Sequence, residues 1–104
     1  MSSVPVVKVV NRTSATTDAH ERIRNILHHL LAELVGSEET LAVKFYVGEK
    51  TVVYQVDCTP QALGRVIGTK GKNITAVRHI IGAMMSRNGM RAVIEIPYFP
   101  SSGK

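Results

Sequence analysis

The residues best suited to bind another molecule lie in one short turn, Gly68-Thr69-Lys70-Gly71. Its two glycines have no side chain, so a ligand can approach the main chain closely and the backbone can adopt positive φ angles. The helical pattern after the turn predicts a helix N-terminus there, where unpaired N–H groups and the positive end of the helix dipole favour an anion. Lys70 adds a positive charge at the tip. We therefore expect the turn to bind a ligand that carries phosphates.

The two glycines also have a purely structural explanation, in which Gly68 is a helix stop and Gly71 a compact turn residue. The context favours the binding interpretation. The aliphatic pair Val66-Ile67 precedes the turn, Ile74 follows it, and basic residues flank it on both sides. At the level of sequence both explanations stay open.

The charge distribution agrees with an anionic ligand. The chain has 104 residues and a formal net charge of +5. Residues 58–94 contain no Asp or Glu but hold Arg65, Lys70, Lys72, Arg78, Arg87 and Arg91. Residues 13–57 carry instead more acidic than basic side chains. Clustered Lys and Arg supply the sequence-independent part of nucleic-acid affinity, so a nucleic acid is the expected partner. An ordinary solvated basic face is the alternative.

Other kinds of site find little support. His28-His29 occupies adjacent helix positions that face different directions, and no Cys or carboxylate pair lies at ligand spacing. A nucleotide-binding P-loop is excluded, because it requires Gly at Val66 and Ser or Thr at Asn73. His79 is expected to be an ordinary surface histidine, with a phosphate contact as the alternative. Since no nucleophile, base and orienting partner share a recognisable spacing, we predict no catalytic residue, no metal, no cofactor and no enzyme.

Hydrophobic periodicity predicts the elements that position the turn. A helix is expected to begin at Asp18, with Glu21 completing a capping-box-like start, and to stop at Gly36. Two strands, 41–47 and 51–58, alternate apolar and polar residues and are joined by a tight reversal, as in a hairpin.

Two helices flank the turn, and a third strand follows them. Thr59 and Pro60 start a short helix that ends at Gly68. The next helix begins near Gly71, and the third strand stops at Pro97. The core side of that helix is expected to carry Ile74, Val77, Ile80, Ile81, Met84 and Met85. The predicted fold is a two-layer α+β domain with helices on one face of a three-stranded sheet.

The chain ends show no clear pattern. We expect residues 1–16 to form a flexible N-terminal leader, 17–97 the domain, and 98–104 a C-terminal tail. The valines of the leader leave a short extra strand as an alternative. Cys58 falls at an inward-facing strand position, so a packed thiol is expected. No segment approaches the roughly 20 apolar residues of a membrane span, and a cytoplasmic protein is expected.

From about Asp18 to Ile96 the chain resembles a KH domain. The signature V-I-G-x-x-G-x-x-I is present at residues 66–74, and the order α-β-β-α-α-β resembles the type II, prokaryotic arrangement. A free-standing domain of this length is similar to the small bacterial KhpA RNA-binding proteins. The resemblance implies single-stranded RNA as the partner, with the turn clamping the backbone of about four nucleotides and the bases in an aliphatic groove.

The resemblance also implies which residues bind RNA. Those expected to hold phosphates are Gly68, Thr69, Lys70 and Gly71. Those expected to form the groove wall or its support are Val66, Ile67 and Ile74, with Arg65, Lys72 and Arg78 at the rim. The expected function is non-catalytic RNA binding, as an RNA chaperone or a post-transcriptional regulator. The alternative is a protein-interaction module that forms a homodimer, or a heterodimer with another KH protein, and for which RNA contact is secondary.

Overall fold

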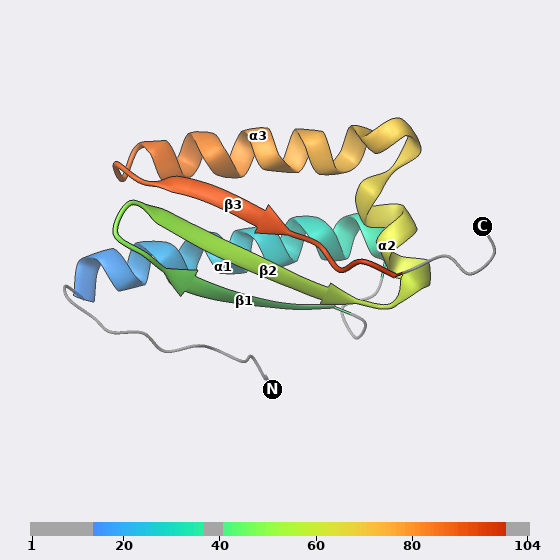
Figure 1. Ribbon diagram of the computed structural model, residues 1–104, viewed down its shortest axis with the longest axis horizontal. Coiled ribbons are helices and arrows are strands. Elements are labelled where there is room, and N and C mark those ends of the chain that lie inside the picture. Colours follow the sequence, from blue (N-terminus) through green and yellow to red (C-terminus); the bar gives the residue numbers. More distant parts are fainter. Residues whose placement is uncertain (1–13, 37–40, 100–104) are drawn as a thin grey trace.

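The computed structural model describes residues 14–36 and 41–99, which form three α-helices, a 3-10 segment and a three-stranded sheet (Figure 1). In chain order the elements are α1 (Ser14–Val35), β1 (Leu41–Val47), β2 (Thr51–Cys58), α2 (Pro60–Ile67), η2 (Thr69–Gly71), α3 (Lys72–Ser86) and β3 (Arg91–Glu95). This order confirms the predicted two-layer α+β class and the type II arrangement of elements.

The sheet has the order β1-β2-β3. The β1–β2 pair is an antiparallel hairpin, closed by a hydrogen bond of 2.7 Å from the Gly48 N–H to the Thr51 carbonyl. Strand β3 pairs with β2 in parallel, so the chain must cross over between them, and α2 and α3 form this crossover. The turn between α2 and α3 consequently lies at the opposite end of the molecule from the hairpin loop (Figure 1).

One hydrophobic core joins the sheet to the helices. Alternate strand residues are buried, as their period-2 pattern predicted. The strand side chains in the core are Leu41, Val43, Phe45, Val52, Tyr54, Val56 and Ile94. The helix side chains packed on them include Ile23, Leu27, Leu31 and Val35 of α1, Ala62 and Val66 of α2, and Ile74, Val77, Ile81 and Met85 of α3. Cys58 is half-buried against this core, which agrees with the expected packed thiol.

The predicted start of the first helix was wrong by four residues. Helix α1 begins at Ser14, so Asp18 and Glu21 lie inside it rather than at its N-terminus. The pattern misled because Ser and Thr residues also suit helix starts, and the residues before Ile23 lack the apolar period that marks a boundary. The N-terminal residues 1–13 and C-terminal residues 100–104, which belong to the expected leader and tail, lie outside the described residues.

One residue expected to face the core does not do so. The side chain of Ile80 is 51% exposed, whereas Val77 and Ile81 on the same helix are buried. Each helical residue is rotated by about 100° from the next, so a position directly before a core residue sits on the flank of the helix. Ile26 of α1 occupies an equivalent flank and is 40% exposed.

Among the helices that the structure describes, none is long and apolar enough to cross a membrane.

Candidate nucleic-acid interface

The turn at Gly68–Gly71 is a bent connection between the end of α2 and the start of α3. Thr69 and Lys70 are exposed, and both glycines are half-exposed. Gly68 caps the C-terminus of α2 with φ 79° and ψ 172°, and Gly71 is the N-cap of α3 with φ 76°. These positive φ angles favour glycine at both positions.

The start of α3 is the helix N-terminus at which the sequence predicts an anion. Because its N-cap Gly71 has no side chain, no side-chain hydrogen bond caps this helix in the described structure, and the same holds for η2 behind Gly68. A helix N-terminus without a cap leaves its first-turn N–H groups to other acceptors, next to the positive end of the dipole. The expected exposed turn is therefore present, with the side chain of Asn73 packed against Gly68.

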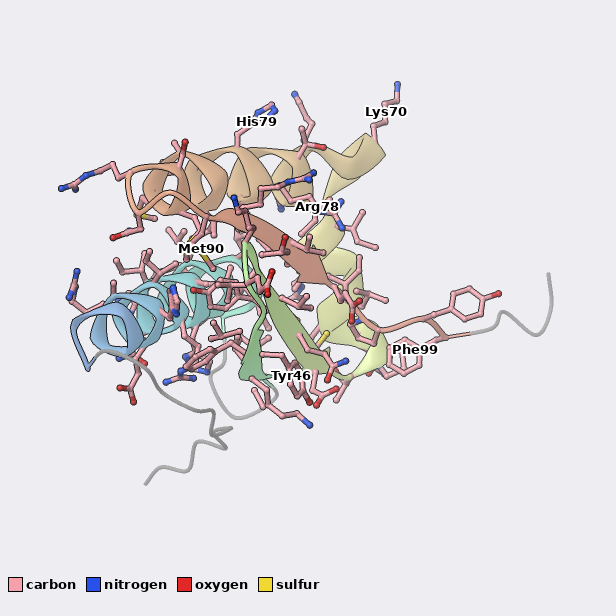
Figure 2. All side chains as sticks on the ribbon, turned by 60° about the vertical axis from the view of Figure 1, so that its left-hand side comes forward. Tyr46, Lys70, Arg78, His79, Met90 and Phe99 are labelled. Carbon is pink, nitrogen blue, oxygen red and sulfur yellow. The ribbon has the colours of Figure 1, made fainter. Side chains whose placement is uncertain are left out.

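Lys70 stands at the tip of this turn. Within the described ranges it is the one non-glycine residue with a positive φ, at 57°. Its side chain extends from the turn into solvent, and His79 projects from α3 toward the same side (Figure 2). The exposed Lys72 begins α3 one residue after the turn. Positive charge is thus presented beside an exposed turn, in which the N–H groups of Gly68 and Gly71 bond the carbonyls of Gly64 and Gly68.

Two of the arginines expected at the rim make hydrogen bonds within the protein. Arg65 Nη1 donates to the Val35 carbonyl at the end of α1, at 3.0 Å. Arg78 Nη2 donates to the Ile94 carbonyl of β3, also at 3.0 Å, and Figure 2 shows Arg78 reaching toward that strand. A guanidinium group has five N–H donors, so each arginine keeps donors beyond the one that it uses here.

The aliphatic residues of the signature differ in depth. Val66 and Ile74 are 0% and 5% exposed and belong to the core, where they support the turn from beneath. Ile67 is half-buried and packs against the core edge. Of the two roles expected for these residues, supporting the turn fits Val66 and Ile74, and only Ile67 presents much surface.

Sequence reasoning missed the role of Asn73. Its side-chain Nδ2 donates to the Arg65 carbonyl at 2.8 Å, across the turn. A Cβ atom placed on Gly68 would lie 2.6 Å from Asn73 Cγ, so the two residues are in close contact. The sequence signal was a short amide side chain in the first turn of a helix that follows a glycine stop.

The described residues bring together no group of His, Cys, Asp or Glu that could hold a metal ion.

Comparison with known proteins agrees with the fold. The family model described as KhpA/KhpB, KH domain, matches residues 24–96, which include both flanking helices and the whole sheet. The chain is 36% identical over 74 residues to the RNA-binding protein KhpA of Aquifex aeolicus, covering 71% of this chain and 94% of that protein.

Two further relatives show a similar extent of likeness. The RNA-binding protein KhpA of Chlamydia pneumoniae is 28% identical over 74 residues, covering 71% of this chain and 95% of that protein. The RNA-binding protein KhpA of Clostridium acetobutylicum is 27% identical over 74 residues, covering 71% of this chain and 99% of that protein. Since the family model spans well over half of the 104 residues and the turn and its crossover helices lie within it, this chain belongs to the KhpA/KhpB family of KH domains.

Proposed function

We propose that this protein binds single-stranded RNA through the main chain of Gly68–Gly71 and catalyses no reaction. The observation that carries the proposal is the exposed turn itself: its Gly71 gives the start of α3 no side-chain cap, and Lys70 stands at its tip. The names of the relatives support it, since those proteins are RNA-binding proteins. A KH-type turn of this kind clamps a short stretch of backbone.

The proposed contacts follow from the geometry. RNA phosphates approach the main chain at Gly68, Thr69, Lys70 and Gly71, where the two glycines add no side chain and the dipole of α3 is favourable. Lys72 adds charge beside them. Arg65 and Arg78 contribute through the N–H groups that their bonds to Val35 and Ile94 leave over. Val66, Ile67 and Ile74 shape the apolar side of the site, the first and last from within the core.

This mode of binding favours limited sequence preference. Phosphate contacts fix the register of a nucleic acid but carry no sequence information themselves. Weak, sequence-tolerant binding of unpaired RNA suits an RNA chaperone or a post-transcriptional regulator in the bacterial cytoplasm, and we include this role in the proposal.

The direct test is the Thr69→Asp/Lys70→Asp double variant. It places negative charge where phosphates are proposed to lie, and both residues are exposed, so the fold should persist. The matched control is Arg22→Glu/Asn25→Glu on the exposed side of α1, which changes the net charge by the same amount. We expect the turn variant to lose RNA binding in a fluorescence anisotropy titration while the control retains most of it. Equal affinities of the two folded variants would remove the turn from the mechanism.

A second candidate function, docking to another KH protein, is favoured by exposed apolar surface on the helices. Arg24 and Arg78 reach carbonyls of the outer strands β1 and β3, so these flanks of α1 and α3 face the sheet edges. Ile26 and Ile80, two residues further along each helix, lie on the opposite flanks, which face the neighbouring helix. The exposed isoleucines therefore border one surface between α1 and α3.

We propose that this surface mediates a homodimer, or a heterodimer with a second KH protein, alongside RNA binding. Light scattering after size-exclusion chromatography tests the homodimer. We expect Ile80→Glu to lower the mass from dimer to monomer and to leave the RNA affinity of the turn nearly unchanged. A wild-type protein that stays monomeric at high concentration would exclude the homodimer, and a dimer insensitive to Ile80→Glu would place the interface elsewhere.

A further inference from the structure

The backbone of the turn adopts an unfavourable conformation that something must hold in place. Three of its four residues have positive φ: Gly68 at 79°, Lys70 at 57° and Gly71 at 76°. For Lys70 this conformation brings Cβ against backbone atoms and is costly. Such backbone conformations persist only where the surrounding structure determines them. The exposed position of the turn leaves few neighbours for this task.

Main-chain hydrogen bonds hold part of the turn, including one of 3.0 Å from the Gly71 N–H to the Gly68 carbonyl, and Asn73 is the side chain that adds to them. Its Nδ2 bonds the Arg65 carbonyl at 2.8 Å, which links the first turn of α3 directly to the last turn of α2. Carbonyl groups in the last turn of a helix lack a helical donor, and Asn73 supplies one here. The same side chain packs on Gly68, with Cγ only 2.6 Å from the place that a Cβ would occupy. One residue thus closes the loop by a hydrogen bond and fills its inside.

The hydrogen bond from Asn73 to the Arg65 carbonyl is supported by a second bond of Arg65. Arg65, whose carbonyl accepts the bond from Asn73, uses its own guanidinium to bond the Val35 carbonyl of α1. The positions of α1, α2 and α3 are therefore connected through Arg65 and Asn73 at the base of the turn. A turn fixed in this way has little freedom to lose when a ligand binds.

We infer that Asn73 is a positioning residue for RNA binding: its side chain pre-organises Gly68–Gly71 in the conformation that accepts phosphates. This inference rests on the proposed function. Its physical basis is that a site which is competent only part of the time binds with an affinity reduced by that fraction. Loss of the Asn73 side chain lowers the fraction of molecules whose turn has the conformation that binds phosphates. It removes no charge and no atom proposed to touch RNA.

The test compares Asn73→Ala with Asn88→Ala. Asn88 is a matched control because its Nδ2 also bonds a main-chain carbonyl, that of Met84, at the far end of α3. The probe is a fluorescein-labelled, unstructured single-stranded RNA of about twelve nucleotides, long enough for the roughly four that a KH turn contacts. We expect Asn73→Ala to bind about two- to tenfold more weakly, as the loss of one such bond implies, and Asn88→Ala to bind as the wild type does.

Two readouts separate positioning from contact. Asn73→Ala should leave the slope of log affinity against log salt unchanged, because it removes no charge, whereas Lys70→Ala should make it shallower by about 0.7. Amide hydrogen exchange of the RNA-free protein should become faster at Thr69–Gly71 and stay unchanged in β2. The shape-preserving variant Asn73→Asp loses the N–H donor but favours the α3 dipole, so it should stay folded and show the same faster exchange.

Each outcome has a defined meaning. If Asn73→Ala binds RNA as the wild type does while Thr69→Asp/Lys70→Asp does not, the inference is wrong and the proposed function stands. If Asn73→Ala binds weakly but exchange at the turn is unaltered in both Asn73 variants, Asn73 contacts RNA directly and the positioning role is wrong. If Thr69→Asp/Lys70→Asp binds normally, the proposed function fails and the inference fails with it.

Discussion

Lys70 combines an exposed charge with a left-handed backbone, and substitutions can separate the two properties. Lys70→Ala removes the charge but leaves a Cβ on a residue with positive φ. Lys70→Gly removes both the charge and the Cβ, so that the positive φ no longer has a steric cost. We expect the two variants to bind RNA equally weakly, since each loses one phosphate contact. We expect Lys70→Gly to be the more stable by about 0.5–1 kcal/mol, because glycine adopts this conformation without a steric cost.

Urea unfolding and RNA titration of the same two proteins check this prediction. Equal stabilities of the two variants would mean that the turn relaxes when RNA is absent, and unequal affinities would mean that the conformation at residue 70, beyond its charge, sets binding.

His20 is a second residue with a measurable signature. It is 1% exposed, and neither ring nitrogen has a hydrogen-bond partner among the described residues. Burial disfavours the charged imidazolium, so the pKa of His20 lies below its ordinary value of 6.5. Below pH 6.5 the unfolded chain takes up a proton that the folded chain does not. Stability is therefore complete above pH 6.5 and falls as the pH drops from there toward the folded-state pKa.

The expected slope is at most about 1.4 kcal/mol per pH unit in the free energy of unfolding. Urea unfolding at several pH values between about 7.5 and 5 measures it. His20→Leu should flatten this part of the profile, whereas His79→Gln on the surface should not. A wild-type free energy of unfolding that stays constant below pH 6.5 would contradict the lowered pKa of His20. So would an equal loss of stability at acid pH in the His20→Leu variant.

At the scale of elements, arginine side chains connect the turn-bearing helices to the rest of the domain. Arg65 joins α2 to the end of α1, and Arg78 joins α3 to β3. Removing such a hydrogen bond costs about 1 kcal/mol. We therefore expect Arg65→Ala and Arg78→Ala to lower both stability and RNA affinity, and Lys72→Ala, on an exposed residue, to lower affinity alone. Chemical unfolding and RNA titration distinguish the two patterns, and an Arg65→Ala variant as stable as the wild type would contradict the structural half of this account.

The elements also show how far local pattern reaches. Thr59 as N-cap, Pro60 at the first position and Gly68 as stop defined α2 correctly, because each residue has a specific local geometry. The alternation of apolar and polar residues also defined the hairpin correctly, because successive side chains of a strand point to opposite faces of the sheet. The start of α1 was missed, since several consecutive polar residues suit a helix start. The exposure of Ile80 was missed because an apolar type does not reveal whether a flank position is covered.

The candidate site was predictable to the same degree. The glycine turn and its basic neighbours follow from residue types at fixed spacing. The bonds of Arg65, Arg78 and Asn73 do not, because each depends on where separate elements meet in space. The sequence named Arg65 and Arg78 as rim residues, and the structure adds that each also holds two elements together.

At the scale of the molecule, the excess of positive charge belongs to the part of the chain that forms the crossover and β3, because residues 58–94 carry basic side chains and no acidic one. If three or four phosphates are neutralised there, log affinity should fall against log salt with a slope of roughly −2 to −3. Between about 50 and 200 mM salt this corresponds to a loss of about 15- to 65-fold in affinity. An affinity that does not depend on salt would contradict an electrostatic clamp.

The face of the sheet that the helices do not cover is a second surface to compare with the turn. Tyr46, Val53 and Val93 stand in register across the three strands and point away from the helices, with Tyr46 and Val93 exposed. An aromatic and aliphatic row of this kind is the other surface on which bases could stack. The turn and this row lie on separate parts of the domain, so a residue-resolved experiment separates them.

The most direct measurement is therefore a two-dimensional ¹⁵N–¹H NMR titration of the protein with unstructured single-stranded RNA. Our account predicts that the largest chemical-shift changes occur at the amides of Gly68, Thr69, Lys70, Gly71 and Lys72. Changes concentrated at Tyr46, Val53 and Val93, with the amides of the turn unmoved, would contradict it.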